Sequence, residues 1–404
     1  MPDPREVDVA DVWKKDRLAA RLLRHEGLVR FEYTPDYLSA PGPPVATTLP
    51  LDPEPVVRAN GALPAFFSGL LPEGARLTAL LRRVKTSASD ELSLLLALGG
   101  DTVGDVRVLP EGEEPSETPA TVRAERWEDT DFVELFAAAV GVDVDDAERA
   151  ALPGAQVKVS AEVISFPVRH RVGAAILKLS PPDYPLIVEN EHFFMRMAAG
   201  CGLRVADVEV VHDRNGRSGL LVRRFDRVLV DRSVTRLAQE DGCQLLDLYP
   251  ADKYRVRFLE LCRRVMQVST VPLPDALALV QAAAFSYAIG NGDLHAKNLS
   301  VGETLHGDVR LTPVYDMLST LAYMPGDQLA LAIEGRRDRL RRSHLVAFAA
   351  RLGVPERATL RMLDHMCEAA AQWVEQLSGI GFDDRITARL EREMRRRIAD
   401  LRAA

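Results

Sequence analysis

The chain has 404 residues, enough for two or three domains of ordinary size. Its 47% hydrophobic and 27% charged residues are typical of a globular protein in water, and no apolar run approaches the ~20 residues that cross a membrane. A net charge of −8 argues against broad non-specific binding to nucleic acid, and the polar N-terminus lacks a signal-peptide core. We therefore expect a cytoplasmic protein without membrane association, whose four scattered cysteines are reduced and buried.

Residues 1–112 are predicted to form a small α/β domain. Apolar stretches bounded by turn residues predict strands at 12–13, 22–23, 28–33 and 106–109. Helices are predicted within 61–83, where Pro72-Glu73-Gly74 divides two pieces, and over 89–98. The acidic segment 111–122 contains Pro and Gly and lacks apolar periodicity, so it marks a domain boundary.

Residues 123–226 are predicted to contain a second sheet. A glycine-containing turn at 153–159 lies between strand-like segments, where backbone N–H groups can approach a phosphate closely. A simple hairpin turn is the alternative for this segment. The other predicted elements are helices at 131–140 and 189–198 and paired strands at 208–211 and 219–222.

Lys178 lies within the apolar strand-like segment 174–179. A buried ammonium group is costly unless it is paired, so this side chain needs an anion. A nucleotide phosphate would serve, and so would Glu189 or Glu191 at the start of the helix that follows. In the alternative, Lys178 stands at a strand end and extends its ammonium group to water.

Residues 227–404 are predicted to be helical. Apolar periodicity predicts helices at 254–268, 274–289, 343–352 and 355–377. Near the C-terminus, the cluster Arg395–Arg397 lies among apolar residues spaced as on one helix face, so we expect it on the solvent-facing side of an amphipathic helix; a basic face toward DNA or an acidic partner is the alternative. A small sheet-containing lobe before a large all-helical lobe is the order of a protein kinase, so the predicted fold class is α+β, protein-kinase-like and two-lobed.

The segment 289–300 has the pattern of a catalytic loop between two apolar elements. Asp293 and Asn298 are five positions apart, as are the proton-accepting Asp and the metal-binding Asn of kinases. Asp316 follows the strand-like residues 309–311, where kinases keep a second metal-binding Asp. Asn, Gly and Asp before a short strand are also ordinary turn formers, which is the alternative. We favour a kinase that uses ATP and Mg²⁺.

Taken together, these segments resemble the HipA family of bacterial serine/threonine kinases, the toxins of HipA–HipB toxin–antitoxin pairs. The resemblance covers nearly the whole chain. The shared motifs are Phe66–Pro72 (F-F-x-x-L-L-P), Gly100–Gly104, Gly154–Lys158, Ile176–Lys178, Asn190-Glu191, Arg224–Arg227, Gln239–Gln244, 289–300 and Leu311–Asp316.

The resemblance implies a role for each matching position. Asp293 is expected to be the catalytic base, Asn298 and Asp316 the Mg²⁺ ligands, and Lys178 the residue that holds the ATP phosphates. The phosphate-covering loop would comprise Gly154, Ala155, Gln156, Val157 and Lys158. The hinge that grips adenine through backbone groups would comprise Val222, Arg223, Arg224 and Phe225. Further nucleotide-site residues would be His295, Lys297 and Tyr315.

The same resemblance implies partners. We expect a protein substrate such as an aminoacyl-tRNA synthetase, a small helix-turn-helix antitoxin similar to HipB, and contact with DNA mainly through that antitoxin. Family members regulated by autophosphorylation carry a serine where this chain has Ala151, so we expect that self-inactivating switch to be absent. Arg223 also replaces a residue that can be Glu in the family, which leaves side-chain contacts to the nucleotide open.

Two other functions compete with this one. Gly292-Asp293-Leu294-His295 resembles the G-D-L-H of aminoglycoside phosphotransferases, which would indicate a small-molecule kinase. The N-terminal α/β domain, which those enzymes lack, argues against it. The second alternative is a catalytically quiet co-repressor that binds an antitoxin, and the presence of Asp293, Asn298, Asp316 and Lys178 argues against loss of catalysis.

Overall fold

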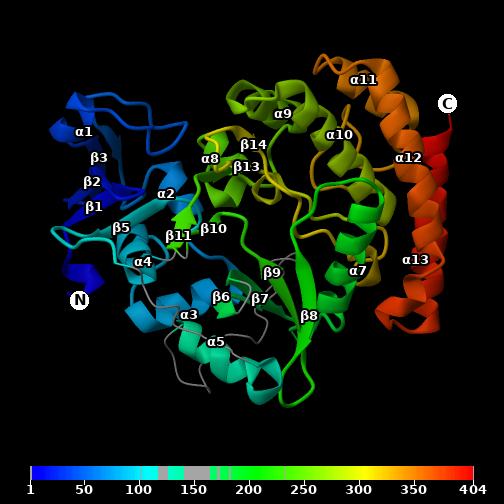
Figure 1. Cartoon of the computed structure of the whole chain (residues 1–404), viewed down its shortest axis with the longest axis horizontal. Helices are drawn as coiled ribbons and strands as arrows, with labels where there is room; N and C mark the ends of the chain where they lie inside the picture. Colours follow the sequence, from blue (N-terminus) through cyan, green and yellow to red (C-terminus); the bar gives the residue numbers. More distant parts are fainter. Residues whose placement is uncertain are drawn as a thin grey trace.

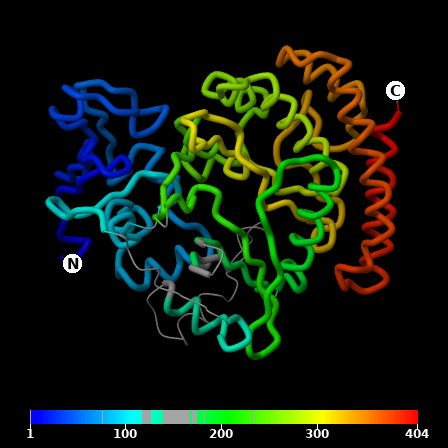
Figure 2. Tube along the Cα trace, in the orientation of Figure 1, coloured from blue at the N-terminus to red at the C-terminus, as the bar shows by residue number. Residues whose placement is uncertain are grey.

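The computed structural model describes residues 2–100, 102–116, 126–140, 164–170, 173–181, 183–231 and 233–403. A five-stranded sheet lies at one end of the longest axis, and the C-terminal helices lie at the other (Figure 1). A four-stranded sheet occupies the space between them (Figure 1). The segment 290–341, which precedes the C-terminal helices and begins yellow in the trace, runs through the middle of the molecule (Figure 2).

The N-terminal region, here residues 2–116, is built on an antiparallel sheet of order β4-β3-β2-β1-β5. Its strands are β1 (Val9–Lys14), β2 (Arg17–His25), β3 (Leu28–Tyr33), β4 (Val56–Arg58) and β5 (Val106–Pro110). Buried and exposed residues alternate along β3, so one face of the strand packs on the core. Glu26 and Gly27 both have positive φ, which suits the tight turn between β2 and β3. The predicted strands of this region are confirmed.

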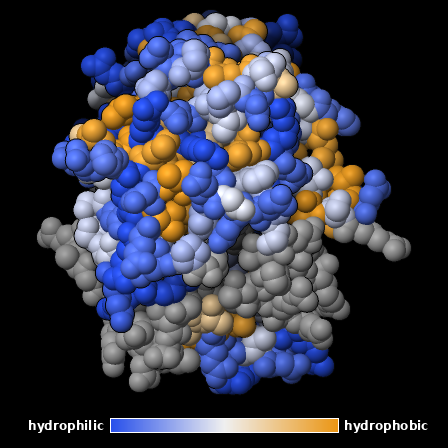
Figure 3. Space-filling model, turned by 90° about the vertical axis from the view of Figure 1, so that its left-hand side faces the viewer, coloured by the Kyte–Doolittle hydropathy of each residue, from blue (hydrophilic) through white to orange (hydrophobic). Residues whose placement is uncertain are grey.

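The helices α1 (Pro35–Ser39), α2 (Ala65–Gly69) and α4 (Glu91–Leu98) pack with this sheet. A further helix of the region, α3 (Gly74–Val84), packs against α4 and against the second sheet. The predicted break at Pro72-Glu73-Gly74 separates α2 from α3, and Asp90 caps α4 by accepting the Ser93 N–H group. The face on this side of the molecule is mainly hydrophilic, with scattered apolar side chains (Figure 3). Leu28, Leu51 and Val57 are among the exposed apolar residues of this region.

The second sheet is antiparallel, with the order β6-β7-β9-β8. Its elements are β6 (Ile164–His170), β7 (Gly173–Leu179), β8 (Val208–His212) and β9 (Ser218–Arg223), with helices α5 (Phe132–Val140) and α7 (Ile187–Gly200). Ala79 of α3 belongs to the same buried cluster as Phe132 and Leu177, so a helix from the N-terminal region helps to cover this sheet. The predicted division at 112 and 123 stays a prediction.

The C-terminal part is organised around α10 (Pro272–Ile289), which is buried along most of its length. The other helices are α8 (Gly242–Leu245), α9 (Phe258–Val268), α11 (Arg342–Ala350), α12 (Glu356–Val374) and α13 (Asp384–Arg402). The prediction of an all-helical lobe was wrong. A hairpin, β10 (Arg227–Val230) with β11 (Ser233–Arg236), and a sheet of β12 (Gln239–Asp241), β13 (Ser300–Glu303) and β14 (Val309–Leu311) lie within it. Of these strands, β14 covers the residues 309–311 that the sequence already marked as strand-like, and the others are too short to show a period-2 pattern against the helical background.

A second correction concerns α13. Arg395 is exposed as predicted, but Arg397 is only 2% exposed. Its guanidinium group donates to the Tyr287 carbonyl (3.1 Å) and to the Asp327 carbonyl (2.9 Å). Arg397 therefore ties the C-terminal helix to the end of α10 and does not face water.

All four cysteines are free and buried, as predicted. Burial raises the pKa of each thiol, to about 12 for Cys201 and Cys243. No helix among the described ranges combines the length and apolar character needed to span a membrane.

Candidate active site

The loop that follows α10 is positioned by glycines. Gly290 caps α10 with a φ of 69°, a left-handed conformation that ends the helix. The Gly292 N–H group donates to the Thr320 hydroxyl (2.9 Å), which itself donates to Asp327 (2.6 Å). A Cβ atom on Gly292 would lie 1.9 Å from an Asp327 oxygen. Only glycine therefore fits this position while Thr320 and Asp327 keep their places.

Replacing Gly292 with alanine is expected to lower the free energy of unfolding by about 1–3 kcal/mol, because the new methyl group must displace Asp327 or the loop. Urea unfolding measures this loss. Gly379→Ala is the matched control, because a Cβ atom there meets nothing within 4 Å. If both variants are as stable as the wild type, the close packing of Gly292 against Asp327 is not a constraint.

Asp293 lies in this loop with only 3% of its surface exposed. Asn291 accepts the Asp293 N–H group (2.8 Å), so the side chain of one loop residue fixes the backbone of another. The Tyr254 hydroxyl donates to Asp293 Oδ1 (2.6 Å). The carboxylate is thus held in one orientation before any substrate arrives, as a general base requires. No sequence pattern pointed to Tyr254, which precedes α9 and reaches Asp293 only through the tertiary fold.

Lys178 of β7 is buried, and it forms an ion pair with Glu191 of α7 (2.6 Å) and another with Asp316. Burial alone lowers the pKa of a lysine, but the two carboxylates outweigh burial and raise the pKa of Lys178 above its ordinary value. Of the two partners that the sequence offered, the structure shows the carboxylate of the following helix, whereas contact with a nucleotide phosphate stays a prediction; the alternative of a water-exposed ammonium group is wrong. The Lys178–Asp316 pair joins the four-stranded sheet to the segment that carries Asp316.

Asn298 and Asp316 lie side by side, since Asn298 Nδ2 donates to Asp316 Oδ2 (3.2 Å). Asn298 Oδ1 is buried and has no hydrogen-bond partner among the residues that the structure describes. Within the same ranges, no three His, Cys, Asp or Glu side chains are grouped as a metal site. A free amide oxygen beside a carboxylate fits Mg²⁺, which is commonly held by one or two protein ligands together with substrate phosphates. Asp316 has a φ of 56°, a strained conformation of the kind that concentrates at functional sites.

His295 is buried beside the ring of Tyr254, with 5.0 Å between the ring centroids. Burial, assisted by the Lys253 ammonium group, lowers the pKa of His295 to about 3. The imidazole is therefore neutral at pH 7 and cannot supply a positive charge to a phosphate.

This pKa predicts a loss of stability in mild acid. The unfolded chain binds a proton at His295 near pH 6.5, whereas the folded chain does so only near pH 3. Stability should therefore fall as the pH drops below 6.5, by up to about 1.4 kcal/mol per pH unit from this residue. Urea unfolding between pH 7 and pH 5 should show a smaller slope for His295→Gln than for the wild type. His25→Gln, at a residue 85% exposed, should keep the wild-type slope; equal slopes for all three would contradict the prediction.

Lys297 faces the N-terminal region. Its ammonium group lies 3.2 Å from the Gly69 carbonyl and 3.2 Å from Glu73, and 3.6 Å from Asp241. Lys253 also binds Glu73. Burial by itself raises the pKa of Glu73, but Lys297 and Lys253 outweigh it and lower that pKa to about 2. A contact of Lys297 with the nucleotide stays a prediction, and the structure adds a contact across the chain that the sequence did not suggest.

The predicted hinge begins within the last two residues of β9 and continues beyond the strand. The N–H groups of Arg223 and Arg224 donate to the carbonyls of Asp207 (2.9 Å) and Ala174 (3.0 Å). Arg223 is exposed, and its guanidinium group lies 3.7 Å from Asp207. Val222 is buried in the sheet core. Adenine binding by this segment stays a prediction, and two of its N–H groups are already used within the protein.

Phe225 and Tyr315 come together where the hinge meets the Asp316 segment, with 5.9 Å between their ring centroids. The Tyr315 hydroxyl donates to the Lys297 carbonyl (2.7 Å) and also shares a hydrogen bond with Ser300 (2.7 Å). Tyr315 therefore braces the loop that carries Asn298. The predicted phosphate loop, Gly154, Ala155, Gln156, Val157 and Lys158, and the regulatory position Ala151 lie outside the described residues.

Comparison of the sequence with known proteins shows which family the chain belongs to. Residues 150–374 match the HipA-like C-terminal domain, and residues 10–109 match the HipA N-terminal domain. The chain is similar to the Sinorhizobium fredii protein Y4mE, at 32% identity over 93% of this chain and 94% of that protein. It is also similar to the serine/threonine-protein kinase toxin HipA of Shewanella oneidensis, at 28% identity over 85% of this chain and 83% of that protein.

The fold is shared with a solved structure of HipA from Shewanella oneidensis in complex with HipB and its operator DNA. The TM-score is 0.76 at 22% identity, over 97% of each chain. The match to the HipA N-terminal domain falls within the N-terminal region of the structure, and the match to the HipA-like C-terminal domain covers the residues of the candidate site that the structure describes. The chain belongs to the HipA family.

Proposed function

We propose that this chain is a serine/threonine protein kinase that transfers the γ-phosphoryl group of ATP to a hydroxyl group of a cytosolic protein. The observation that carries the proposal is the convergence of residues far apart in sequence. Asp293 and Asn298 share one buried loop, and both Asn298 and Lys178 bind Asp316. The Lys178–Glu191 pair also matches the strand–helix ion pair that active kinases require. In this proposal β6–β9 with α7 form the small lobe and α8–α13 the large lobe.

Each residue then has a role in one balanced step. The acceptor hydroxyl oxygen bonds to the γ-phosphorus, its proton passes to Asp293, and the bond to the β-phosphate oxygen breaks to release ADP. Lys178 pairs with phosphate oxygens. Asn298 Oδ1 and Asp316 would hold Mg²⁺, which when bound offsets charge on the phosphates. The fixed orientation of Asp293 under Tyr254 lets the base act without rearrangement.

The relatives support a finer proposal about biological role. The Shewanella oneidensis relative is named a toxin, and a HipA of that organism was solved with HipB and operator DNA. We extend this to a growth-inhibiting toxin with a HipB-like antitoxin, in which DNA is contacted mainly through the antitoxin. The substrate class proposed is a translation factor such as an aminoacyl-tRNA synthetase.

A small-molecule kinase is the second candidate, favoured only by the local sequence Gly292–His295. The contacts of Lys297 with Gly69 and Glu73 make the N-terminal region part of the site's support, which argues for the protein kinase.

Induced expression in a bacterial host, with growth curves and a phosphoproteome, tests the proposal. Wild type should arrest growth and create new Ser/Thr phosphosites, and Asp293→Asn should do neither. Arrest by both would indicate toxicity through binding, as for a quiet co-repressor. Neither arrest nor phosphosites from the wild type would favour the small-molecule kinase.

A separate experiment addresses self-inactivation. Because Ala151 replaces the serine of autophosphorylated relatives, mass spectrometry after incubation with ATP and Mg²⁺ should find no phosphate on residues 150–160. Ser160 is the hydroxyl in this segment that could substitute, and a phosphate mapped there would contradict the prediction.

A further inference from the structure

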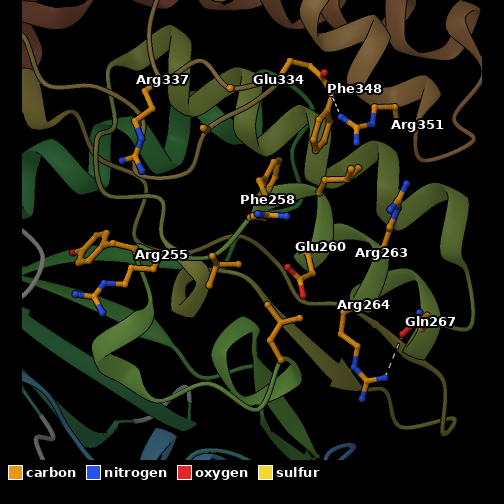
Figure 4. A pocket seen from close by; sticks show the side chains of 17 residues that line it. Arg255, Phe258, Glu260, Arg263, Arg264, Gln267, Glu334, Arg337, Phe348 and Arg351 are labelled. Carbon is orange, nitrogen blue, oxygen red and sulfur yellow. Dashed lines mark hydrogen bonds and ion pairs between the residues drawn. The ribbon is translucent and has the colours of Figure 1, made fainter.

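A cavity of about 940 Å³ opens between α9, α11 and the segment around Arg337 (Figure 4). Six arginines and two glutamates line it: Arg255, Arg257, Arg263, Arg264, Arg337, Arg351, Glu260 and Glu334. We call this cavity the arginine groove. Arg255 and Arg337 lie on one side in the close view, and Arg263, Arg264 and Arg351 lie on the other (Figure 4). Its volume lies within the range of ligand-binding clefts.

Some of these guanidinium groups are already engaged. Arg264 Nε donates to the Leu245 carbonyl (2.9 Å), Arg351 pairs with Glu334 (2.9 Å), and Arg255 pairs with Asp252 (3.2 Å). In contrast, Arg257, Arg263 and Arg337 are exposed. No ion pair or side-chain hydrogen bond links any of these three to another residue in the described part of the chain. The groove therefore presents positive charge that the protein itself does not neutralise.

The arginine groove adjoins the proposed catalytic base. Tyr254 lines the groove, and its hydroxyl donates to Asp293 Oδ1 (2.6 Å). A polypeptide that places a serine or threonine hydroxyl at Asp293 could therefore continue directly into the groove. The adjacency is independent of which residues hold the nucleotide.

We infer that the arginine groove binds an acidic segment of the protein substrate, flanking the residue that is phosphorylated. This inference rests on the proposed kinase function, because it assigns a partner to the same site. Glutamate and aspartate side chains match the planar, multi-donor guanidinium group, which can bind a carboxylate through two parallel hydrogen bonds. Each such ion pair contributes only a modest binding free energy at an exposed site, so several arginines must act together to hold the segment.

The lining disfavours nucleic acid as the occupant. Glu260 and Glu334 would repel a phosphodiester backbone, whereas a peptide can place neutral residues beside them. Single-stranded nucleic acids also need exposed aromatic faces on which bases stack. Phe258 and Phe348 stack on each other, with 5.3 Å between ring centroids, and are 2% and 1% exposed, so their faces are not available. Tyr254, the other aromatic residue of the lining, is half-buried, and its ring packs against that of His295.

The test is direct binding without ATP, by fluorescence anisotropy at low salt. The probes are a short labelled peptide of alternating glutamate and alanine, the same peptide with glutamine, and a labelled oligothymidylate. The groove variant is Arg263→Ala with Arg337→Ala. The matched control is Arg357→Ala with Arg361→Ala, two exposed arginines of α12 that do not line the groove.

The acidic peptide should bind the wild type and Asp293→Asn equally, and the groove variant about tenfold more weakly. The control should bind like the wild type, and the glutamine peptide and oligothymidylate should bind more weakly than the acidic peptide. Equal binding by groove variant and wild type, no binding of the acidic peptide, or tighter groove-dependent binding of oligothymidylate would each overturn the inference. Failure of the kinase proposal appears separately, as absent phosphosites in cells expressing the wild type.

Discussion

Asp293→Asn is expected to lower phosphoryl transfer by about 10²- to 10⁴-fold while the protein remains folded. Asparagine has the same shape, and its oxygen can still accept the Tyr254 hydrogen bond, so the loop should keep its geometry. What is lost is the group that takes the proton of the attacking hydroxyl. Phosphosite intensities in the host proteome measure transfer, and urea unfolding measures folding.

Asp364→Asn is the matched control for this substitution. The Asp364 side chain is 62% exposed on α12, and it pairs with Arg342 away from the site. It should transfer phosphate at the wild-type rate. Asp293→Asn with undiminished transfer would show that the carboxylate is not the base, and loss of folding in that variant would leave stability, not chemistry, as its role.

Lys178→Met is expected to remove ATP-dependent transfer and also to destabilise the fold, by about 3–5 kcal/mol. The Lys178 ammonium group is buried between Glu191 and Asp316, so its removal leaves the 2% exposed Glu191 without its positive partner. Burial then favours the protonated form of Glu191, whose pKa burial already raises above its ordinary value in the intact pair. The stability deficit of the variant relative to the wild type should therefore become smaller as the pH is lowered toward 5, while both proteins share the loss of stability that comes from His295.

A double variant separates the loss of ATP-dependent transfer from the loss of stability. Lys178→Met with Glu191→Gln has neither charge of the strand–helix pair, so urea unfolding should give a stability well above that of Lys178→Met alone. Binding of Mg²⁺-ATP, followed by the shift in melting temperature, should stay absent in both. ATP binding that returns with the double variant would mean that Lys178 supports the fold and does not hold phosphate.

The sequence predicted the local features of the site well. A helix that ends in glycine, an Asp and an Asn five residues apart, and an Asp after a short strand all obey local rules, and α10, Asp293, Asn298 and Asp316 are where those rules put them. An argument about burying a charge gave two possible partners for Lys178, a nucleotide phosphate or a glutamate of the next helix, and the pair with that glutamate is present.

The contacts that the sequence did not predict are all long-range. Tyr254 reaches Asp293, and Glu73 reaches Lys253 and Lys297, across many intervening residues. Asp293 and Lys297 belong to the 289–300 motif, but no pattern in the sequence marks Tyr254 or Glu73 as their partners. Arg397 was misplaced because it directly follows Arg395 and Arg396, which are not buried, whereas the carbonyls that bind it come from Tyr287 and Asp327. Periodicity reports which face of a helix is apolar; it does not report which polar side chain finds a buried partner.

The ion pairs of Glu73 also affect whether the C-terminal unit can be expressed without the N-terminal unit. Two family models divide this chain into an N-terminal and a C-terminal unit, which invites expression of the second unit by itself. Such a fragment would lose Glu73 and the Gly69 carbonyl, and would leave the largely buried ammonium groups of Lys253 and Lys297 with less negative charge around them. The C-terminal unit therefore depends on the N-terminal unit of its own chain. A chimera that combines units from two relatives would need to keep these contacts.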